Sequence, residues 1–304
     1  MDKTSRMKLL IPLDGSPLAE RVLTAAAQLA RKTHAAVNLL HVLEKDPPDK
    51  VHGQMHLTTA NQAEEYLRAT AESRIFKGID VKFHVHLVGV RDVSQSISDH
   101  IEELKQDMVI MCTHGSSGLH DLFVGSIAQQ VVSLSKTPVM LVNPSLEKSK
   151  AEPNFQSFLV PLDGNPDHEH GLEYALNLAE LCQAKIHLMI AVPRLGTMSG
   201  ELTTITRYLP GTTARMMDMV VPDARAYLRK LGSKFEDLGQ TISTTISRSD
   251  PSKAIFKIAR TSKSDLIILA THGKRGAKPF WEGSVTPRVI RSSELPILLV
   301  PVRE

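Results

Sequence analysis

The sequence predicts an α/β protein of two tandem domains, each a doubly wound, Rossmann-like domain around a five-stranded parallel sheet. Two observations lead to this prediction. Short apolar segments alternate with segments of helical periodicity, an order typical of parallel sheets with helices on both faces. A glycine motif in the first half, with Gly115 and Gly125, recurs as Gly273 and Gly283, in each case 158 residues later. One chain therefore contains the same domain twice.

The boundary between the domains is marked by a stretch in which Pro144 and Pro153 flank a run of charged residues. Proline and charge in that density are typical of a linker. We place domain 1 at residues 1–143, the linker at 144–156 and domain 2 at 157–304.

The elements of domain 1 follow from apolar periodicity and from helix-start residues. The first strand is a short apolar run, and Ser16 followed by Pro17 suits the N-cap and first position of the next helix. That helix has apolar residues at helical spacing, the second strand is apolar, and a polar stretch with prolines is a loop. A helix, an alternating strand and a third helix follow, and the fourth and fifth strands are continuously apolar. The expected ranges are strand 8–13, helix 18–32, strand 36–42, loop 44–58, helix 60–76, strand 81–88, helix 93–105, strand 107–111, helix 126–135 and strand 138–142.

Domain 2 repeats this order for the same reasons. Its one departure is a long loop through Gly211 between the second strand and the following helix. The expected ranges are strand 158–162, helix 169–182, strand 185–192, helix from about 223 to 238, strand 241–247, helix 252–262, strand 265–269, helix 284–293 and strand 296–300.

The long loop is also where the two copies differ in length. Asp14 and Asp163, which end the first strands, are 149 residues apart, nine fewer than the paired glycines. Domain 2 is therefore expected to carry nine inserted residues around Pro193–Met217. We expect this insertion to cover the second site as a lid.

The charge and composition exclude several function classes. The net charge is only +3, its basic residues are spread along the chain, and aromatic residues make up 4%. This is not the concentrated basic surface of a nucleic-acid-binding protein. The N-terminal residues show no signal-peptide core, and no apolar run approaches the roughly 18–20 residues that span a membrane. Cys112 and Cys182 fall at unrelated points of the repeats, which favours reduced, buried thiols. We expect a cytoplasmic protein without nucleic-acid or membrane partners.

The recurring motif suits a phosphate. A strand, a glycine-bearing loop and a helix N-terminus in that order bring backbone N–H groups and the helix dipole to an anion. Ligands of such sheets bind at the carboxyl ends of the strands. Asp14 and Asp163 lie at those ends, so a carboxylate beside a phosphate loop in each domain indicates a nucleotide site. The alternative is that these aspartates only form Asp-Gly turns.

Histidines and the single tryptophan do not indicate catalysis or a metal. His114 and His272 lie in the motif without a nucleophile or base beside them, so a loop-orienting role is favoured over a catalytic one. Trp281 is expected to pack or to form an interface. The closely spaced histidine pairs come without a recognisable third ligand; they are His52 and His56, His84 and His86, and His168 and His170.

With these motifs, the chain resembles the universal stress protein family in its tandem two-domain form. The family pattern is Gly-x-x-Gly, nine residues, then Gly-Ser or Gly-Thr, preceded by an acidic residue at the end of the first strand. The resemblance covers nearly the whole chain. It implies a fold similar to adenine nucleotide alpha hydrolases, with strand order 3-2-1-4-5, which places strands 1 and 4 side by side.

The resemblance also implies the residues of two ATP sites. The acidic residue and a second-strand position meet the adenine, and the glycine loop and the following Ser hold the phosphates. Mg²⁺, if present, bridges the phosphates. The matching positions are Asp14, Val42, Cys112, Gly115, Gly125, Ser126 and Ile127 in domain 1, and Asp163, Val192, Ala270, Gly273, Gly283, Ser284 and Val285 in domain 2.

Both copies depart from the pattern at its first glycine, which is Cys112 in one and Ala270 in the other. A β-carbon there crowds the ribose or phosphates, and more so for Cys. Lys274 and Arg275 add positive charge beside the second loop only. The second site is therefore expected to bind more tightly than the first.

The resemblance implies a cytosolic stress-response protein whose ATP occupancy biases its conformation or its choice of partner, with at most slow hydrolysis. One alternative is an interaction scaffold of the same fold that has lost the nucleotide. An adenylating ATP pyrophosphatase is a third, less favoured interpretation, because the loop after the first strand lacks its Ser-Gly-Gly sequence. Family members pair through their fifth strands, so strands near Val139–Val142 and Ile297–Val300 are expected to pair with each other; homodimerisation and the protein partner stay open.

Overall fold

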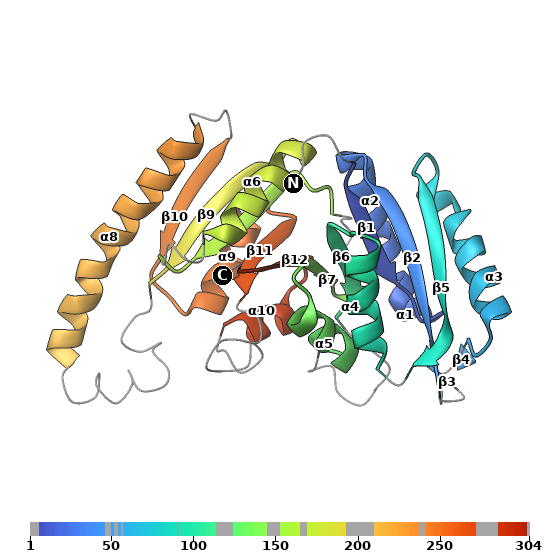
Figure 1. Ribbon diagram of the computed structural model, residues 1–304. Helices are drawn as coiled ribbons and strands as arrows, with labels where there is room; N and C mark the ends of the chain where they lie inside the picture. The colour runs from blue at the N-terminus through green and yellow to red at the C-terminus, as the bar shows by residue number, and fades with distance from the viewer. Residues whose placement is uncertain are drawn as a thin grey trace.

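The computed structural model shows an α/β protein with two similar halves (Figure 1). The structure describes residues 6–45, 50–51, 54–55, 57–90, 92–113, 124–144, 153–164, 169–192, 210–236, 241–271 and 285–302.

Domain 1 has a five-stranded parallel sheet in the order β5-β2-β1-β6-β7, which is 3-2-1-4-5 in chain order. This confirms the expected strand order, and β1 and β6 lie side by side as it requires. β6 and β7 are almost wholly buried, as apolar strands covered on both faces should be. The strands are β1 (Lys8–Pro12), β2 (Ala36–Glu44), β5 (Val81–Val90), β6 (Met108–Cys112) and β7 (Val139–Val142).

Domain 2 repeats this sheet in the order β10-β9-β8-β11-β12. Its strands pair in parallel throughout. They are β8 (Ser157–Leu162), β9 (Lys185–Ala191), β10 (Ile242–Ser247), β11 (Leu266–Thr271) and β12 (Ile297–Pro301).

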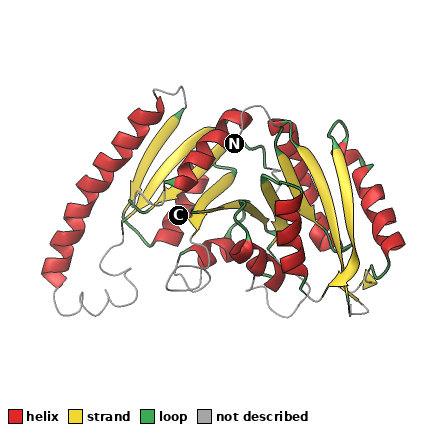
Figure 2. Cartoon of the chain, in the orientation of Figure 1, coloured by secondary structure: helices red, strands yellow, loops and turns green. Residues whose placement is uncertain are grey.

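Helices cover both faces of each sheet (Figure 2). One buried cluster lies under α2, α3, α6 and α8 and runs through both domains, and a second lies under α4, α5, α9 and α10. The helices are α1 (Pro17–Glu20), α2 (Val22–Thr33), α3 (Ala60–Ala71), α4 (Val93–Glu103), α5 (Ser126–Leu134), α6 (His170–Cys182), α8 (Pro210–Glu236), α9 (Pro251–Thr261) and α10 (Thr286–Ser292), with a 3₁₀ turn at Arg74–Phe76.

The two sheets join into one sheet of ten strands through the fifth strand of each domain. β7 pairs with β12 in antiparallel register, with Met140 opposite Leu298. This confirms the expected pairing of the fifth strands. The Asn143 side chain donates to the Ser293 carbonyl at 3.1 Å, and the Tyr174 hydroxyl donates to the Asp107 carbonyl at 3.2 Å, so hydrogen bonds reinforce the junction.

Three element predictions need correction. The helix expected at 18–32 is interrupted at Arg21, where α1 ends and α2 begins. The loop expected at 44–58 contains a short antiparallel pair, β3 (Lys50–Val51) and β4 (Gln54–Met55). The helix expected from about 223 begins thirteen residues earlier, at Pro210.

The predicted insertion was also wrong in its size. In domain 1, Val37 of β2 pairs with Val81 of β5, and in domain 2 the equivalent Ile186 pairs with Ile242. These third strands are therefore offset by 161 residues, so domain 2 gains twelve residues before its third strand and loses three after it. The offset of 158 residues between the glycine motifs, from which nine inserted residues were predicted, measures only the net difference in length between the two domains. Residues 193–209 of the insertion lie outside the described part, and the rest belongs to α8.

Candidate functional site

The strand-end acid of domain 1 lies beside the end of the fourth strand. Asp14 follows β1, Cys112 ends β6, and the two strands are parallel neighbours. Burial, followed by the nearby Asp14 charge, raises the pKa of the Cys112 thiol to about 12. The two side chains therefore share one edge of the sheet, as the strand order predicted.

The turn after β1 is tightly specified. Asp14 Oδ1 accepts a hydrogen bond from Ser16 N at 2.9 Å, and Ser16 Oγ accepts one from Ala19 N at 3.1 Å, which confirms Ser16 as a helix cap. Gly15 has φ +83°, and a Cβ there would lie 2.7 Å from Leu57 Cδ1. Only glycine fits this position. Leu57 was missed from the sequence because a contact across 42 positions leaves no local pattern.

Cys112 also ties the first helix to the fourth strand. Its thiol donates to the Leu18 carbonyl at 2.9 Å in α1. On the other side, the His41 ring contacts the Leu13 carbonyl at 2.8 Å and so holds the end of β1 to β2. Val42, the predicted adenine-contacting position, follows on β2 and is buried. The ends of strands 1, 2 and 4 thus form one rigid edge.

The second half of the motif returns to this edge. Gly125 N donates to the Thr113 carbonyl at 2.6 Å, so the start of α5 is anchored one residue beyond β6. Gly125 is the N-cap of α5 with φ −56° and, being glycine, has no side chain that could cap this helix. Ser126 begins the helix, and Ile127 is 39% exposed beside it. The N-cap residue therefore leaves the first N–H groups of α5 uncapped by its own side chain.

Domain 2 presents the same positions with different surroundings. Asp163 is exposed after β8, and Gly164 has φ +84° with no described atom within 4 Å of the place that a Cβ would take. Val192 is buried, and its N–H donates to the Ser247 carbonyl at 2.8 Å. Ala270 lies in β11 and Val285 is the N-cap residue of α10.

Ala270 is packed against the start of the first helix of domain 2. A Cβ at Gly171 of α6 would lie 3.1 Å from the Ala270 Cβ. The counterpart of Gly171 in domain 1 is Val22, which is buried. In domain 2, α6 and β11 can therefore approach each other closely. The glycine that allows this is Gly171 on the helix, because the motif position on the strand is Ala270.

The remaining predicted site residues lie outside the described part of the chain. These are Gly115, Gly273, Gly283 and Ser284, together with His114, His272, Lys274, Arg275 and Trp281.

One histidine pair has a third histidine beside it. The His84 and His86 rings on β5 lie 5.0 and 5.1 Å, centroid to centroid, from the buried His100 ring on α4. His100 Nδ1 contacts the Ser96 carbonyl at 2.7 Å and therefore carries the proton. Among the described residues, no group of three His, Cys, Asp or Glu side chains is arranged to hold a metal ion.

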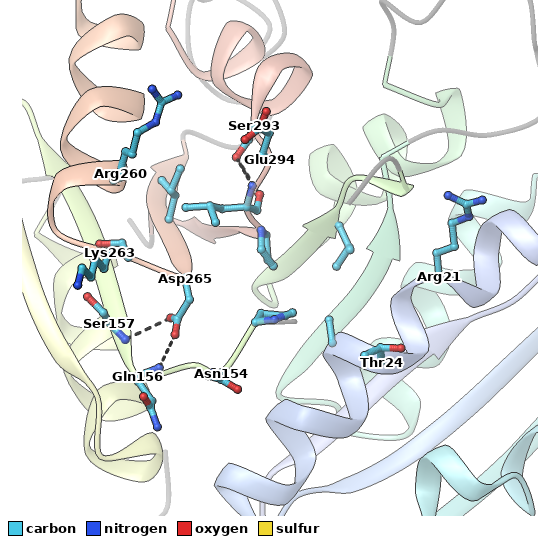
Figure 3. Close-up of a pocket in the computed structure, with 18 of the residues that line it drawn as sticks. Arg21, Thr24, Asn154, Gln156, Ser157, Arg260, Lys263, Asp265, Ser293 and Glu294 are labelled. Carbon is cyan, nitrogen blue, oxygen red and sulfur yellow. Dashed lines mark hydrogen bonds between the residues drawn. The ribbon is translucent and has the colours of Figure 1, made fainter. Parts of the chain in front are cut away.

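A large pocket of about 1510 Å³ lies between the domains (Figure 3). Its walls come from α1 and α2 of domain 1 and from the strand starts of domain 2, where Asp265 accepts hydrogen bonds from the backbone of Gln156 and Ser157. Basic and acidic side chains both line it, with Arg21 and Arg260 on opposite walls (Figure 3). It meets the amino ends of domain 2's strands and, in domain 1, the carboxyl end of β7 and the helix that follows β1, so it is not at the carboxyl-end edge of domain 2.

Within the described ranges, no helix combines the length and apolar character needed to cross a membrane.

The comparisons with known proteins agree with this architecture. The model of the universal stress protein family matches residues 5–143 and again 154–301. A universal stress protein of Mycolicibacterium smegmatis is 21% identical over 307 residues, which cover 97% of each chain. Another, from Methanocaldococcus jannaschii, is 25% identical over 149 residues, covering 48% of this chain and 82% of the relative.

Solved structures show the same fold over the whole chain. The structure of a universal stress protein from Archaeoglobus fulgidus matches with a TM-score of 0.67 and 18% identity, over 97% of this chain and 98% of the other. That of a universal stress protein from Pseudomonas aeruginosa matches with a TM-score of 0.65 and 16% identity, over 98% and 94%. With the family model matched once in each half, this chain belongs to the universal stress protein family, in its tandem two-domain form.

Proposed function

We propose that this chain binds adenine nucleotide, specifically ATP, at the carboxyl ends of its strands and acts as a cytosolic stress-response regulator. The observation that supports this most is the convergence, in domain 1, of a carboxylate, a strand end and a helix N-terminus at one edge. Asp14 lies beside Cys112, and the start of α5 is anchored next to them by the bond from Gly125 to Thr113.

In this proposal the nucleotide is oriented by charge. The phosphates lie at the N-terminus of α5, where Gly125 brings no side chain and the backbone N–H groups of Ser126 and Ile127 favour an anion. The adenine end lies toward Asp14 and Val42, because a carboxylate accepts hydrogen bonds from amino and hydroxyl groups but repels phosphate. Mg²⁺ would be held mainly by the phosphates.

Domain 2 is proposed to hold a second nucleotide in the same orientation. The proposed residues are Asp163, Val192, Ala270, Gly273, Gly283, Ser284 and Val285. The surroundings of the two aspartates differ. Asp163 is exposed, whereas Asp14 is half-buried and precedes Gly15, which lies against Leu57. The two sites are therefore proposed to differ in affinity.

The test is calorimetric titration of ATP, with and without Mg²⁺, into nucleotide-free protein. Gly125→Val and Gly283→Val should each remove one of two binding events, because a branched side chain blocks the approach of phosphate to the backbone. Gly232→Ala on α8 is the control, since a Cβ there would meet Thr244 Cγ2 of β10 at an ordinary distance of 3.9 Å and touches neither proposed site.

Two results would contradict the proposal. One is absence of heat together with absence of retained nucleotide in the wild-type protein, which would favour the interaction scaffold. The other is unchanged stoichiometry in both glycine variants while circular dichroism shows them folded.

A further inference from the structure

The helix that follows the third strand begins in the same way in both domains. Asp92 caps α4 and its carboxylate accepts a hydrogen bond from the Ser94 hydroxyl at 2.6 Å. Asp250 caps α9 and accepts one from the Ser252 hydroxyl at 2.5 Å. Each carboxylate also accepts a backbone N–H of the first helical turn. Because these helices start where the third strands end, both caps lie at the carboxyl-end edge of their sheet, where ligands of such sheets bind.

One residue of the motif helix reaches this cap in each domain, but its charge differs. In domain 1, the side-chain amide of Gln130 on α5 contacts the Ser94 hydroxyl at 2.5 Å. In domain 2, the residue 158 positions later is Arg288 on α10, and its Nη1 donates to Asp250 Oδ2 at 3.2 Å. The repeat therefore keeps the position and its contact with the cap, and exchanges a neutral amide for a cation.

This position lies one helical turn beyond the proposed phosphate-binding serine. Ser126 is the first residue of α5 and Gln130 follows four residues later, so the two lie on the same face of the helix. Helical side chains lean toward the N-terminus, so the side chain at position 130 leans toward the turn that Ser126 begins. The backbone around Arg288 is helical as well, because Val289 N donates to the Val285 carbonyl at 2.9 Å. A cation at this position therefore lies close to the proposed phosphates.

The cap orients the Arg288 guanidinium and leaves it accessible. The side chain of Arg288 is 42% exposed, whereas that of Asp250 is 15% exposed. Burial disfavours the ionised Asp250 carboxyl, but the hydrogen bonds of the cap and the Arg288 charge outweigh burial and lower its pKa. An ion pair this exposed adds little stability, and domain 1 joins the same two helices through the neutral Gln130. Helix packing therefore does not account for the arginine, whereas its planar group of N–H donors suits a phosphate.

We propose that Arg288 makes the second site selective for a nucleotide with a long phosphate chain, a triphosphate over a monophosphate, and that Gln130 leaves the first site less selective. This selectivity rests on the proposed nucleotide function and names the ligand class of that same site. Its physical basis is charge. ATP carries more negative charge than AMP, so a cation near the phosphates attracts ATP more strongly.

The experiment exchanges the two residues in the full-length protein. Calorimetric titrations with ATP and with AMP are made without Mg²⁺, which would neutralise part of the phosphate charge. In a Gly125→Val background, which isolates the second site, Arg288→Gln should weaken ATP binding by about fivefold and AMP binding by less than about twofold. Arg288→Lys, which keeps the charge, should retain most of the preference for ATP. In a Gly283→Val background, Gln130→Arg should strengthen ATP binding at the first site by a similar factor.

Arg291→Gln is the matched control. It removes the same charge from the same helix, but Arg291 lies in the last turn of α10, where its Nε donates to the Pro287 carbonyl at 3.3 Å. It should change the ratio of ATP affinity to AMP affinity much less, because attraction falls with distance and is screened by salt. An equal change in this variant would show a general effect of charge and would overturn the selectivity of Arg288.

Two further outcomes separate this selectivity from the nucleotide function itself. An Arg288→Gln protein that is folded by circular dichroism and binds ATP and AMP with the wild-type ratio would overturn the selectivity and leave the nucleotide function in place. Absence of ATP binding at the second site in the Gly125→Val protein would refute the nucleotide function of that site, and the selectivity with it.

Discussion

At the scale of single residues, the cluster of His84, His86 and His100 makes domain 1 sensitive to acid. Burial, then His100, lowers the pKa of His84, and His86 acts in the same direction. Glu103 opposes them. The folded state therefore favours the neutral His84 ring, whereas the unfolded chain titrates near pH 6.5.

The sign of the pH dependence follows from proton uptake. Below about pH 6.5 the unfolded chain binds more protons at His84 than the folded one, so this contribution to stability is complete above that pH and is lost as the pH drops below it. We expect a lower melting temperature at pH 5 than at pH 7.5, and a smaller difference in the His84→Gln, His86→Gln double variant. The double variant should keep a smaller pH dependence of the same sign, because burial also lowers the pKa of His187.

The control for this prediction is His34→Asn. His34 ends α2 with φ 53°, a conformation that Asn tolerates, and it lies outside the cluster. It should keep the wild-type pH dependence. An equal loss of melting temperature on acidification in the double variant would show that the cluster is not its source.

At the scale of elements, α6 lies so close to β11 that a methyl group added to the helix at Gly171 would crowd the strand. Gly171→Ala should destabilise the protein by about 1 kcal/mol, because a Cβ at 3.1 Å from Ala270 costs more than helix propensity returns. Ala270→Gly should remove the clash, so the same change becomes neutral or stabilising in that background. A urea-unfolding double-mutant cycle measures the coupling.

Gly232→Ala provides the comparison for this cycle. It makes the same chemical change in a helix where the new Cβ has room, so it should stabilise the protein by up to about 1 kcal/mol. Additive effects of Gly171→Ala and Ala270→Gly would contradict the tight contact.

Most elements were predictable because their signals are local. Apolar runs located the strands, and Ser16 with Pro17 located the start of α1. The early start of α8 was not predictable, because Pro222 is typical of a first helical turn and the helix continues before it to Pro210. Pro222 aligns with the second residue of α3, Asn61, so the core helix starts where the proline indicates and the insertion extends it.

The site was predictable only in part, for a similar reason. Repetition and strand order brought Asp14 to Cys112 correctly. The hydrogen bond from the Tyr227 hydroxyl on α8 to Glu169, just before α6, was missed because it joins residues 58 positions apart in the sequence. The contact of Leu57 with the Gly15 turn leaves no local pattern either. Contacts between residues that are far apart in the sequence, and that no single repeat offset reveals, can be identified only from the structure.

At the scale of the whole molecule, the antiparallel junction of β7 and β12 sets the two sites apart. Because strands within each domain are parallel, all strands of domain 1 run opposite to those of domain 2. Their carboxyl ends therefore lie at opposite edges of the ten-stranded sheet. A nucleotide at one proposed site does not contact the other, so we expect the two binding events to be independent.

The same junction protects two apolar strands. All four residues of β7 are buried, and β12 covers the edge that would otherwise present unpaired backbone groups. A fragment of residues 1–144 exposes that edge. We expect it to form a homodimer through β7 at concentrations of tens of micromolar, measured by light scattering after gel filtration, because a second β7 supplies the missing antiparallel strand.

Leu141→Pro in this fragment is the variant that separates edge pairing from other contacts. The Pro138 and Val142 carbonyls accept hydrogen bonds from backbone N–H groups in β6 and just after it, so by alternation the backbone of Val139 and Leu141 faces β12. Proline at 141 removes an outward N–H and leaves the bonds to β6 in place. The variant fragment should be monomeric and folded by circular dichroism, whereas an unsubstituted fragment that is folded and monomeric would show that the β7 edge does not drive association.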